Sequence, residues 1–306
     1  MSCLGSLTLP LIGAPMFLVS GPELVIAQCR SGIVGAFPAL NARPAAQLQD
    51  WLERITVALA PDTPYAVNLI VHPDNARLEE DLATCLRFRV PLILTSLSSP
   101  GTLVQAVHAY GGRVFHDVTT MRHAEKALSL GVDGLVLVCA GAGGHGGTLN
   151  PFAFLAEVRR FWGGPIALAG ALTQGQQLRA LEVMGADYGY MGTRFIATQE
   201  ARASVEYKAA LLAANAADIV NTDYFTGIRG NYLKASILQA GLDPDHLPPR
   251  EGGASFAEKA LGEQVKAWRD IWGAGQGVGT LQDIPTVETL IQRLKAEYNS
   301  ALRLAK

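Results

Sequence analysis

A series of eight short apolar runs at regular spacing constrains the fold of this chain more than any other feature. The runs begin near Pro10, Ile33, Tyr65, Pro91, Arg113, Gly134, Pro165 and Asp187, so successive starts are 21 to 32 residues apart. Each interval has room for a strand, a turn and a helix, an alternation typical of a parallel sheet covered by helices. Because the runs are apolar throughout, both faces of each strand are expected to be buried. Eight units within roughly 200 residues predict an α/β fold, a TIM (β/α)8 barrel.

Segments between the runs carry helical periodicity, and several end in glycine. Helices are expected within 23–29, 47–59, 103–110, 123–130 and 176–184, and glycines at 32, 111, 131 and 185 follow four of them. Glycine closes a helix in the left-handed backbone conformation without steric cost. These signals support the barrel prediction.

The rhythm changes after residue 197. One long helix is expected over 200–217, a second over 256–272 and a closing helix over 286–304, with a glycine-rich hinge at 273–279. We therefore predict two domains. The barrel is formed by residues 1–215 and 277–306, and an inserted C-terminal helical lid by residues 216–276.

Charge and composition exclude several classes of partner. The chain has 25 Lys and Arg against 27 Asp and Glu, so no strong overall field attracts nucleic acid or an anionic membrane. Its apolar runs are far shorter than the roughly 18 residues of a membrane span, and no signal peptide is visible. Four scattered cysteines without a C-x-x-C pair indicate reduced thiols, and the histidine spacings indicate no metal site. We expect a cytoplasmic monomer or homodimer that binds small molecules, not nucleic acid or membrane.

Barrel active sites lie at the carboxyl ends of the strands, so the residues that follow the apolar runs are the site candidates. They are Ala14, Pro15 and Met16 after the first run, Asn68 after the third, Thr95 and Ser96 after the fourth, His116 and Asp117 after the fifth, Cys139 and Gly144 after the sixth, Ala169, Gly170 and Ala171 after the seventh, and Met191, Gly192, Thr193 and Arg194 after the eighth.

The loop 141–147 is the strongest local signal, because five glycines flank His145 directly after a buried strand. Glycines let a flat ligand lie close to the backbone, and an imidazole can exchange protons near neutral pH. The loop also satisfies G-x-G-x-x-G, the dinucleotide-binding fingerprint. That interpretation requires an acidic residue about 20 positions on, and residues 161–170 contain none.

Small residues at the ends of the last two runs indicate a phosphate site. Backbone N–H groups at 169–171 and 191–193 can hold a phosphate, with Thr193 adding a hydroxyl and Arg194 a charge. A phosphate site beside a loop for a flat ligand makes FMN the natural candidate cofactor.

Other candidates are less specific. Asn68 suits either a flavin ring edge or a helix cap, and His116 suits either a site or a buried structural role. The predicted lid contains aromatic residues that either wall a substrate pocket or pack the lid onto the barrel. They are Tyr224, Phe225 and Tyr232, and Arg229 lies among them.

Taken together, the motifs resemble the nitronate monooxygenase family, formerly called 2-nitropropane dioxygenases, over almost the whole chain. The resemblance rests on 13–16 (GAPM), 131–133 (GVD), 142–145 (AGGH), 185–187 (GAD), 191–195 (MGTRF) and 274–279 (AGQGVG), in that order. It implies a barrel with a lid and non-covalent FMN held by Met16, Asn68, Gly170, Gly192 and Thr193. It also implies a cytoplasmic oxidoreductase that oxidises alkyl nitronates, and in some members nitroalkanes, with dioxygen.

By the same resemblance His145 lies beside the flavin. It would remove the α-proton of a neutral nitroalkane, or position a nitronate that is already anionic. Three positions depart from the family pattern. Cys139 stands where members commonly have glutamine, Asp117 where many have lysine, and Ala171 where a second glycine is usual. An aspartate facing the flavin would oppose the anionic reduced ring that lysine favours.

Two alternatives remain open. Relatives with the same site are NAD(P)H-dependent flavin reductases acting on quinones or an enoyl thioester. A barrel without flavin, a lyase or isomerase with His145 as base, is also compatible with these loops. It is disfavoured because a Schiff-base aldolase needs a lysine at a strand end, and these loops have none.

Overall fold

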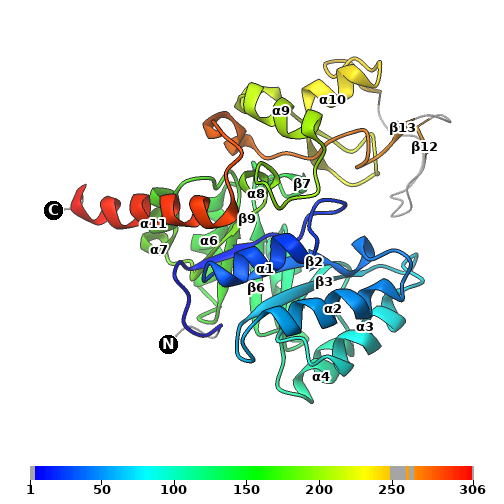
Figure 1. Ribbon diagram of the computed structural model, residues 1–306, viewed down its shortest axis with the longest axis vertical. Helices are drawn as coiled ribbons and strands as arrows, with labels where there is room; N and C mark the ends of the chain where they lie inside the picture. Colours follow the sequence, from blue (N-terminus) through cyan, green and yellow to red (C-terminus); the bar gives the residue numbers. More distant parts are fainter. Residues whose placement is uncertain (1–3, 249–259, 262–264, 305–306) are drawn as a thin grey trace.

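Eight parallel strands form a closed barrel in the computed structural model, which describes residues 4–248, 260–261 and 265–304 (Figure 1). The strands are β1 (Leu11–Gly13), β2 (Gly35–Pro38), β3 (Tyr65–Val71), β4 (Leu92–Leu97), β5 (Arg113–Val118), β6 (Gly134–Val138), β8 (Ile166–Ala169) and β9 (Tyr188–Met191). β1 pairs with β9, and a parallel bridge between Ile12 and Val34 closes the ring. Each strand overlaps one of the eight apolar runs, and the predicted TIM barrel is confirmed.

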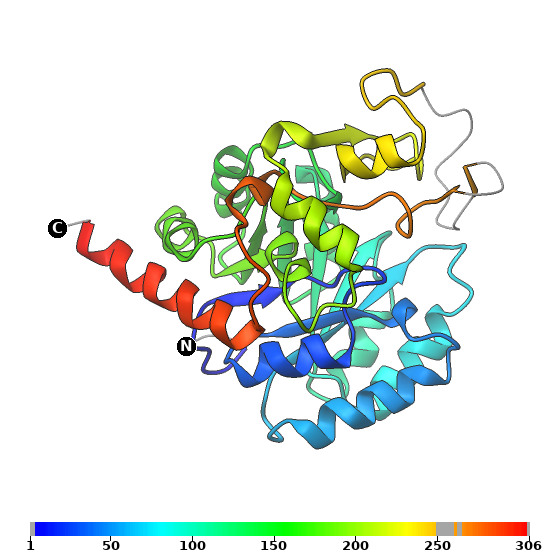
Figure 2. The same cartoon turned by 45° about the horizontal axis from the view of Figure 1, so that its top comes forward.

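Helices cover the outside of the barrel, as Figures 1 and 2 show. They are α1 (Pro22–Arg30), α2 (Gln47–Ala58), α3 (Leu78–Arg87), α4 (Leu103–His108), α5 (Met121–Ser129), α6 (Pro151–Arg159) and α7 (Gly175–Met184). The glycines that follow four of them, at 32, 111, 131 and 185, have φ between 81° and 100°, as the sequence predicted. The closing helix α11 (Val287–Leu304) packs against α7 and α1. Within the described ranges, no helix has the length and apolar character needed to cross a bilayer.

Side chains alternate between two apolar layers. The barrel interior is filled by residues such as Leu94, Phe115, Val136 and Tyr188, whereas their strand neighbours pack against the helices. Successive residues of a strand point to opposite faces, so each strand contributes to both layers. This alternation decides which strand-end residues face the site.

The segment after β9 lies at one end of the barrel, where Figure 1 shows α9 and α10 above the strands. It contains α8 (Thr193–Ile196), α9 (Val205–Ala213), the 3-10 turn η2 (Ala216–Asp218), β10 (Ile219–Thr222), β11 (Gly230–Leu233), α10 (Lys234–Gln239), β12 (Ala260–Leu261), β13 (Val265–Lys266) and the 3-10 turn η3 (Gln276–Thr280). A further 3-10 turn, η1 (Ala39–Asn41), follows β2. β10 and β11 form an antiparallel pair that extends onto the barrel loop strand β7 (Gly144–His145). The domain boundaries predicted for this segment stay a prediction.

Two helix predictions in this part need correction. The helix expected over 200–217 forms only over 205–213, because Ser204 accepts a hydrogen bond from Tyr207 N and caps its start. Asn215 caps the following turn η2, and so ends the run. In the helix expected over 256–272, residues 256–259 and 262–264 lie outside the described residues. The remainder is not helical, since Trp268 has φ 68°.

Candidate active site

A cavity of about 1090 Å³ opens at the carboxyl ends of the barrel strands, beneath the inserted segment. Most of the predicted site residues line it, and they come from five different strands and the loops that follow them. They are Ala14, Pro15, Met16, Asn68, Gly144, His145, Ala169, Gly170, Ala171, Gly192 and Thr193.

Four predicted site residues lie outside this lining. Thr95, His116, Cys139 and Met191 sit one position from residues that face the barrel interior, so the pleat turns their side chains outward. Thr95 Oγ1 lies 2.8 Å from His116 Nδ1, and burial lowers the pKa of His116 to about 4. Burial raises the pKa of Cys139 to about 12, so this thiol is not nucleophilic at neutral pH. None of these four residues lines the cavity, and their binding of the cofactor stays a prediction.

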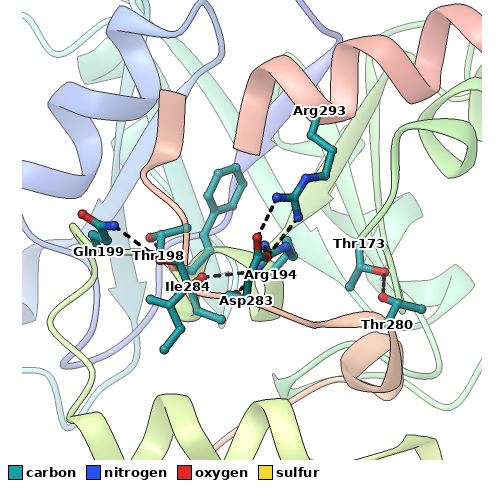
Figure 3. Close-up of polar contacts among 10 residues, drawn as sticks. Thr173, Arg194, Thr198, Gln199, Thr280, Asp283, Ile284 and Arg293 are labelled. Carbon is teal, nitrogen blue, oxygen red and sulfur yellow. Dashed lines mark hydrogen bonds and ion pairs between the residues drawn. The ribbon is translucent and has the colours of Figure 1, made fainter. Parts of the chain in front are cut away.

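Arg194 also points away from the cavity, contrary to its proposed phosphate role. Figure 3 shows Arg194 and Arg293 converging on Asp283, with Nη2 to carboxylate distances of 2.8 and 2.6 Å. Hydrogen bonding by Arg293 and the charges of both arginines hold the pKa of Asp283 below its usual value. This cluster fastens the strand-end helix α8 to the segment that leads into α11. Thr193 does face the cavity, where its Oγ1 accepts a hydrogen bond from Gly275 N at 2.9 Å.

A chain of polar side chains forms part of the cavity floor. Asn68 Nδ2 donates to Ser96 Oγ at 2.7 Å, and Ser96 Oγ donates to Asp117 Oδ2 at 2.8 Å. Asn68 lies in the middle of β3, and Ser96 and Asp117 lie one residue before the ends of β4 and β5; all three line the cavity. Asp117 Oδ1 and the hydroxyl of Tyr190 on β9 are both buried without a hydrogen-bond partner among the described residues. The floor therefore offers two unsatisfied polar atoms to a ligand.

The segment that follows β6 fixes His145 by adding a strand to the inserted sheet. β7 pairs antiparallel with β11, with His145 opposite Gly230 and Gly144 opposite Asn231. Asn231 Nδ2 donates to Ala142 O at 2.6 Å, which fastens the start of the loop to the same strand. His145 therefore lies in a paired strand and not in an unpaired loop.

The hydroxyl of Thr226 assigns the tautomer of His145. His145 Nε2 lies 2.9 Å from Thr226 Oγ1, and that hydroxyl donates its single proton to Ile228 O at 3.0 Å. Because the hydroxyl proton is already used, Nε2 is the donor, and Nδ1 keeps a free lone pair. Trp268 packs edge-on against the imidazole at 5.0 Å. Burial lowers the pKa of His145 to about 4, so the ring is neutral at pH 7.

Several loop glycines make room for protein backbone rather than for a flat ligand. A Cβ on Gly143 would lie 2.8 Å from Gly275 N, and one on Gly147 would lie 2.6 Å from Val138 O. Gly192 differs, because its nearest neighbour would be 3.5 Å away and the residue lines the cavity. The glycine-rich loop therefore owes part of its composition to contact with the 273–275 segment.

Sequence reasoning missed or misassigned several cavity residues. Thr226, Trp268 and Tyr207 line the cavity but were not among the predicted site residues. The aromatic residues Phe225 and Tyr232 instead fill a small core within the inserted segment. That supports the packing interpretation for these two side chains, while Arg229 does line the cavity. The sequence signal that could have identified Thr226 as a site residue is its position beside a cluster of aromatic residues.

Comparisons with known proteins agree with this architecture. The family model described as nitronate monooxygenase matches residues 26–297. A nitronate monooxygenase of Paraburkholderia phytofirmans is 25% identical, over 96% of this chain and 93% of its own. A (3aS,4S,5R,7aS)-5-hydroxy-7a-methyl-1-oxo-octahydro-1H-indene-4-carboxyl-CoA dehydrogenase of Rhodococcus jostii is 24% identical, over 94% and 92%.

Among solved structures, a nitroalkane oxidase of Streptomyces ansochromogenes superposes with a TM-score of 0.78 at 22% identity. The match covers 97% of this chain and 98% of that one, and it supports the barrel fold. Because the family model covers most of the sequence, including the histidine loop, the chain belongs to the nitronate monooxygenase family.

Proposed function

We propose that this chain is an FMN-dependent nitronate monooxygenase that oxidises alkyl nitronates with dioxygen and accepts nitroalkanes as further substrates. The observation that carries the proposal is His145, held neutral with Nδ1 unprotonated in a cavity at the carboxyl ends of the barrel strands. Family membership supports the reaction class. A cytoplasmic location and a monomeric or homodimeric state remain predictions.

The cavity residues fit FMN. Two buried polar atoms, Asp117 Oδ1 and the Tyr190 hydroxyl, have no partner within the described chain and need one from a ligand. Gly170 and Gly192 both line the cavity, and at Gly192, where a Cβ would have no neighbour nearer than 3.5 Å, the missing side chain leaves room for a phosphate. Met16, Asn68 and Thr193 would complete the binding set. When bound, FMN supplies the electron acceptor that passes electrons on to dioxygen.

His145 has two different tasks with the two substrate classes. A neutral nitroalkane carries an acidic α-proton, which the free Nδ1 lone pair of His145 accepts. The resulting imidazolium still donates from Nε2 to Thr226 Oγ1, so the ring keeps its orientation while it is charged. A nitronate is already an anion, and for it His145 only positions the substrate. Trp268 packs edge-on against the imidazole, and β7, which carries His145, pairs with β11.

A second candidate function is an NAD(P)H-dependent FMN reductase acting on quinones or an enoyl thioester. The favouring observations are the size of the cavity, about 1090 Å³, and a relative whose name gives it a CoA-linked substrate. A small nitronate fills little of such a cavity even with a cofactor present, so a larger substrate is compatible with it.

The test begins with the visible spectrum and heat release of any yellow cofactor. Oxygen uptake with propionate 3-nitronate and ethylnitronate then measures the first function, and anaerobic bleaching by NADH measures the second. Uptake without bleaching is expected. FMN-loaded protein that bleaches with NADH and shows no uptake would replace the first function by the second. A colourless protein that takes up no added FMN would reject both.

A further inference from the structure

Asp117 places a carboxyl group on the cavity floor, and its protonation state and its contact with the proposed cofactor are not assigned above. It lies at the end of β5 and lines the cavity. Oδ2 accepts the hydrogen of Ser96 Oγ, whose oxygen is in turn occupied by Asn68 Nδ2. Oδ1 has no hydrogen-bond partner in the described chain. A buried acceptor of this kind calls for a ligand or a proton.

We propose that Asp117 positions the cofactor as a neutral acid, with Oδ1–H donating a hydrogen bond to an acceptor atom of the bound FMN ring. This inference rests on the proposed function, because it requires FMN in the cavity. In this chain the flavin would therefore contact a neutral carboxyl group at the position where many members of the family have a lysine.

The surroundings of Asp117 favour its protonated form. Among the described residues one hydroxyl, that of Ser96, donates to the carboxyl. Two or three donors are what hold a carboxyl in its ionised form. The flanking interior positions, Phe115 and Val138, are apolar. Burial raises the pKa of Asp117 to about 7, and the Ser96 hydrogen bond offsets this only in part.

Three titratable groups near the floor, Tyr190, His116 and His145, have pKa values outside this range. Tyr190 faces Asp117 from β9, and burial raises its pKa well above 10. His116 on the opposite face of β5 and His145 on β7 have pKa values lowered to about 4 by burial. His123 of α5 also lines the cavity, where its Nδ1 lies 3.1 Å from Thr119 Oγ1.

The consequence is a proton-linked affinity. If the complex requires protonated Asp117, the carboxylate that forms above about pH 7 must take up a proton before FMN binds. The dissociation constant of FMN then rises with pH, approaching about tenfold per pH unit. A carboxylate accepting from a ring N–H would produce the opposite slope.

The experiment measures FMN binding to cofactor-free protein by flavin fluorescence, from about pH 6 to about pH 9. Wild type is compared with Asp117→Asn, which keeps the shape and cannot ionise. The matched control is Asp74→Asn, a carboxylate at the cavity mouth whose side chain is 58% exposed. Ser96→Ala is a second variant, because it removes the hydrogen bond that lowers the pKa of Asp117.

The expected result is a rising dissociation constant for wild type and for Asp74→Asn, and a flat one for Asp117→Asn. In Ser96→Ala the rise should begin at higher pH. A wild-type constant that is flat or falls with pH, or a slope that persists in Asp117→Asn, would overturn the inference while leaving FMN binding intact. No FMN binding by wild type at any pH would overturn the proposed function and this inference together.

Discussion

Replacing Asp117 by Asn should change how the stability of the cofactor-free protein depends on pH. Burial raises the pKa of this carboxyl from 3.8 to about 7, a shift of about 3 units. Each unit corresponds to about 1.4 kcal/mol, so the linked free energy is about 4 kcal/mol. Among the described residues no cation contacts the carboxylate to reduce this cost, and Ser96 donates a hydrogen bond to it.

The sign follows from the raised folded-state pKa. Stability from the protonated group is fully present below its unfolded-state pKa of 3.8 and is lost as the pH rises through about 7. Wild type should therefore lose up to about 4 kcal/mol relative to Asp117→Asn between about pH 4 and pH 7, with a constant difference above that. His116 and His145 act in the opposite direction, because their pKa values are lowered to about 4, but both proteins share them.

The assay is urea unfolding followed by circular dichroism at several pH values for both proteins, with the analysis confined to their difference. Asp74→Asn serves as control, since its exposed carboxylate should leave the wild-type pH dependence unchanged. A wild-type minus Asp117→Asn difference that stays constant from about pH 5 to about pH 9 would refute the reasoning. It would show that Asp117 ionises at its ordinary pKa in the folded protein.

Three further predictions concern the histidine loop. His145→Ala should retain FMN and lose about 100-fold or more in turnover with neutral nitroalkanes, but less with nitronates. Equal activity of wild type and variant on both substrates would remove His145 from the mechanism. Thr226→Val should abolish the single Nε2–H tautomer of His145, read from imidazole ¹⁵N shifts, and Thr226→Ser should keep it. Gly143→Ala should cost about 1–3 kcal/mol in thermal unfolding, because its Cβ would lie 2.8 Å from Gly275 N, whereas Gly146→Ala, with 3.4 Å to its nearest neighbour, should cost less.

The barrel could be predicted from sequence because its signal is repeated eight times. Each apolar run supplied one strand, and left-handed glycines such as Gly185 marked the helix ends. The sequence could not predict whether an individual strand side chain points into the barrel or outward to the helices. In a strand buried on both faces the polar and apolar positions do not alternate, so the sequence does not distinguish Thr95 from Ser96, or His116 from Asp117. A shift of one residue exchanges the cavity for the outer layer.

The inserted segment was less predictable because tertiary pairing determines its structure. Gly144 and His145 become a strand only by pairing with β11, which lies more than 80 residues further along the chain. Local propensity carries no information about such a partner. The same separation hides Thr226, whose contact with His145 spans 81 residues.

The polar floor explains how a carboxyl can occupy a position where the family resemblance leads one to expect lysine. Asn68 donates to Ser96, and Ser96 donates to Asp117. This order of donors suits a hydrogen-bond acceptor at position 117, whereas the ammonium group of a lysine is itself a donor. A lysine here would therefore lack a partner on the protein side, and a neutral acid would not. A neutral donor also stabilises a reduced, anionic flavin less than a lysine does. Under the proposed function, this barrel would hold His145 beside an FMN that rests on a floor without a fixed charge, and we expect the reaction to depend on the protonation of Asp117.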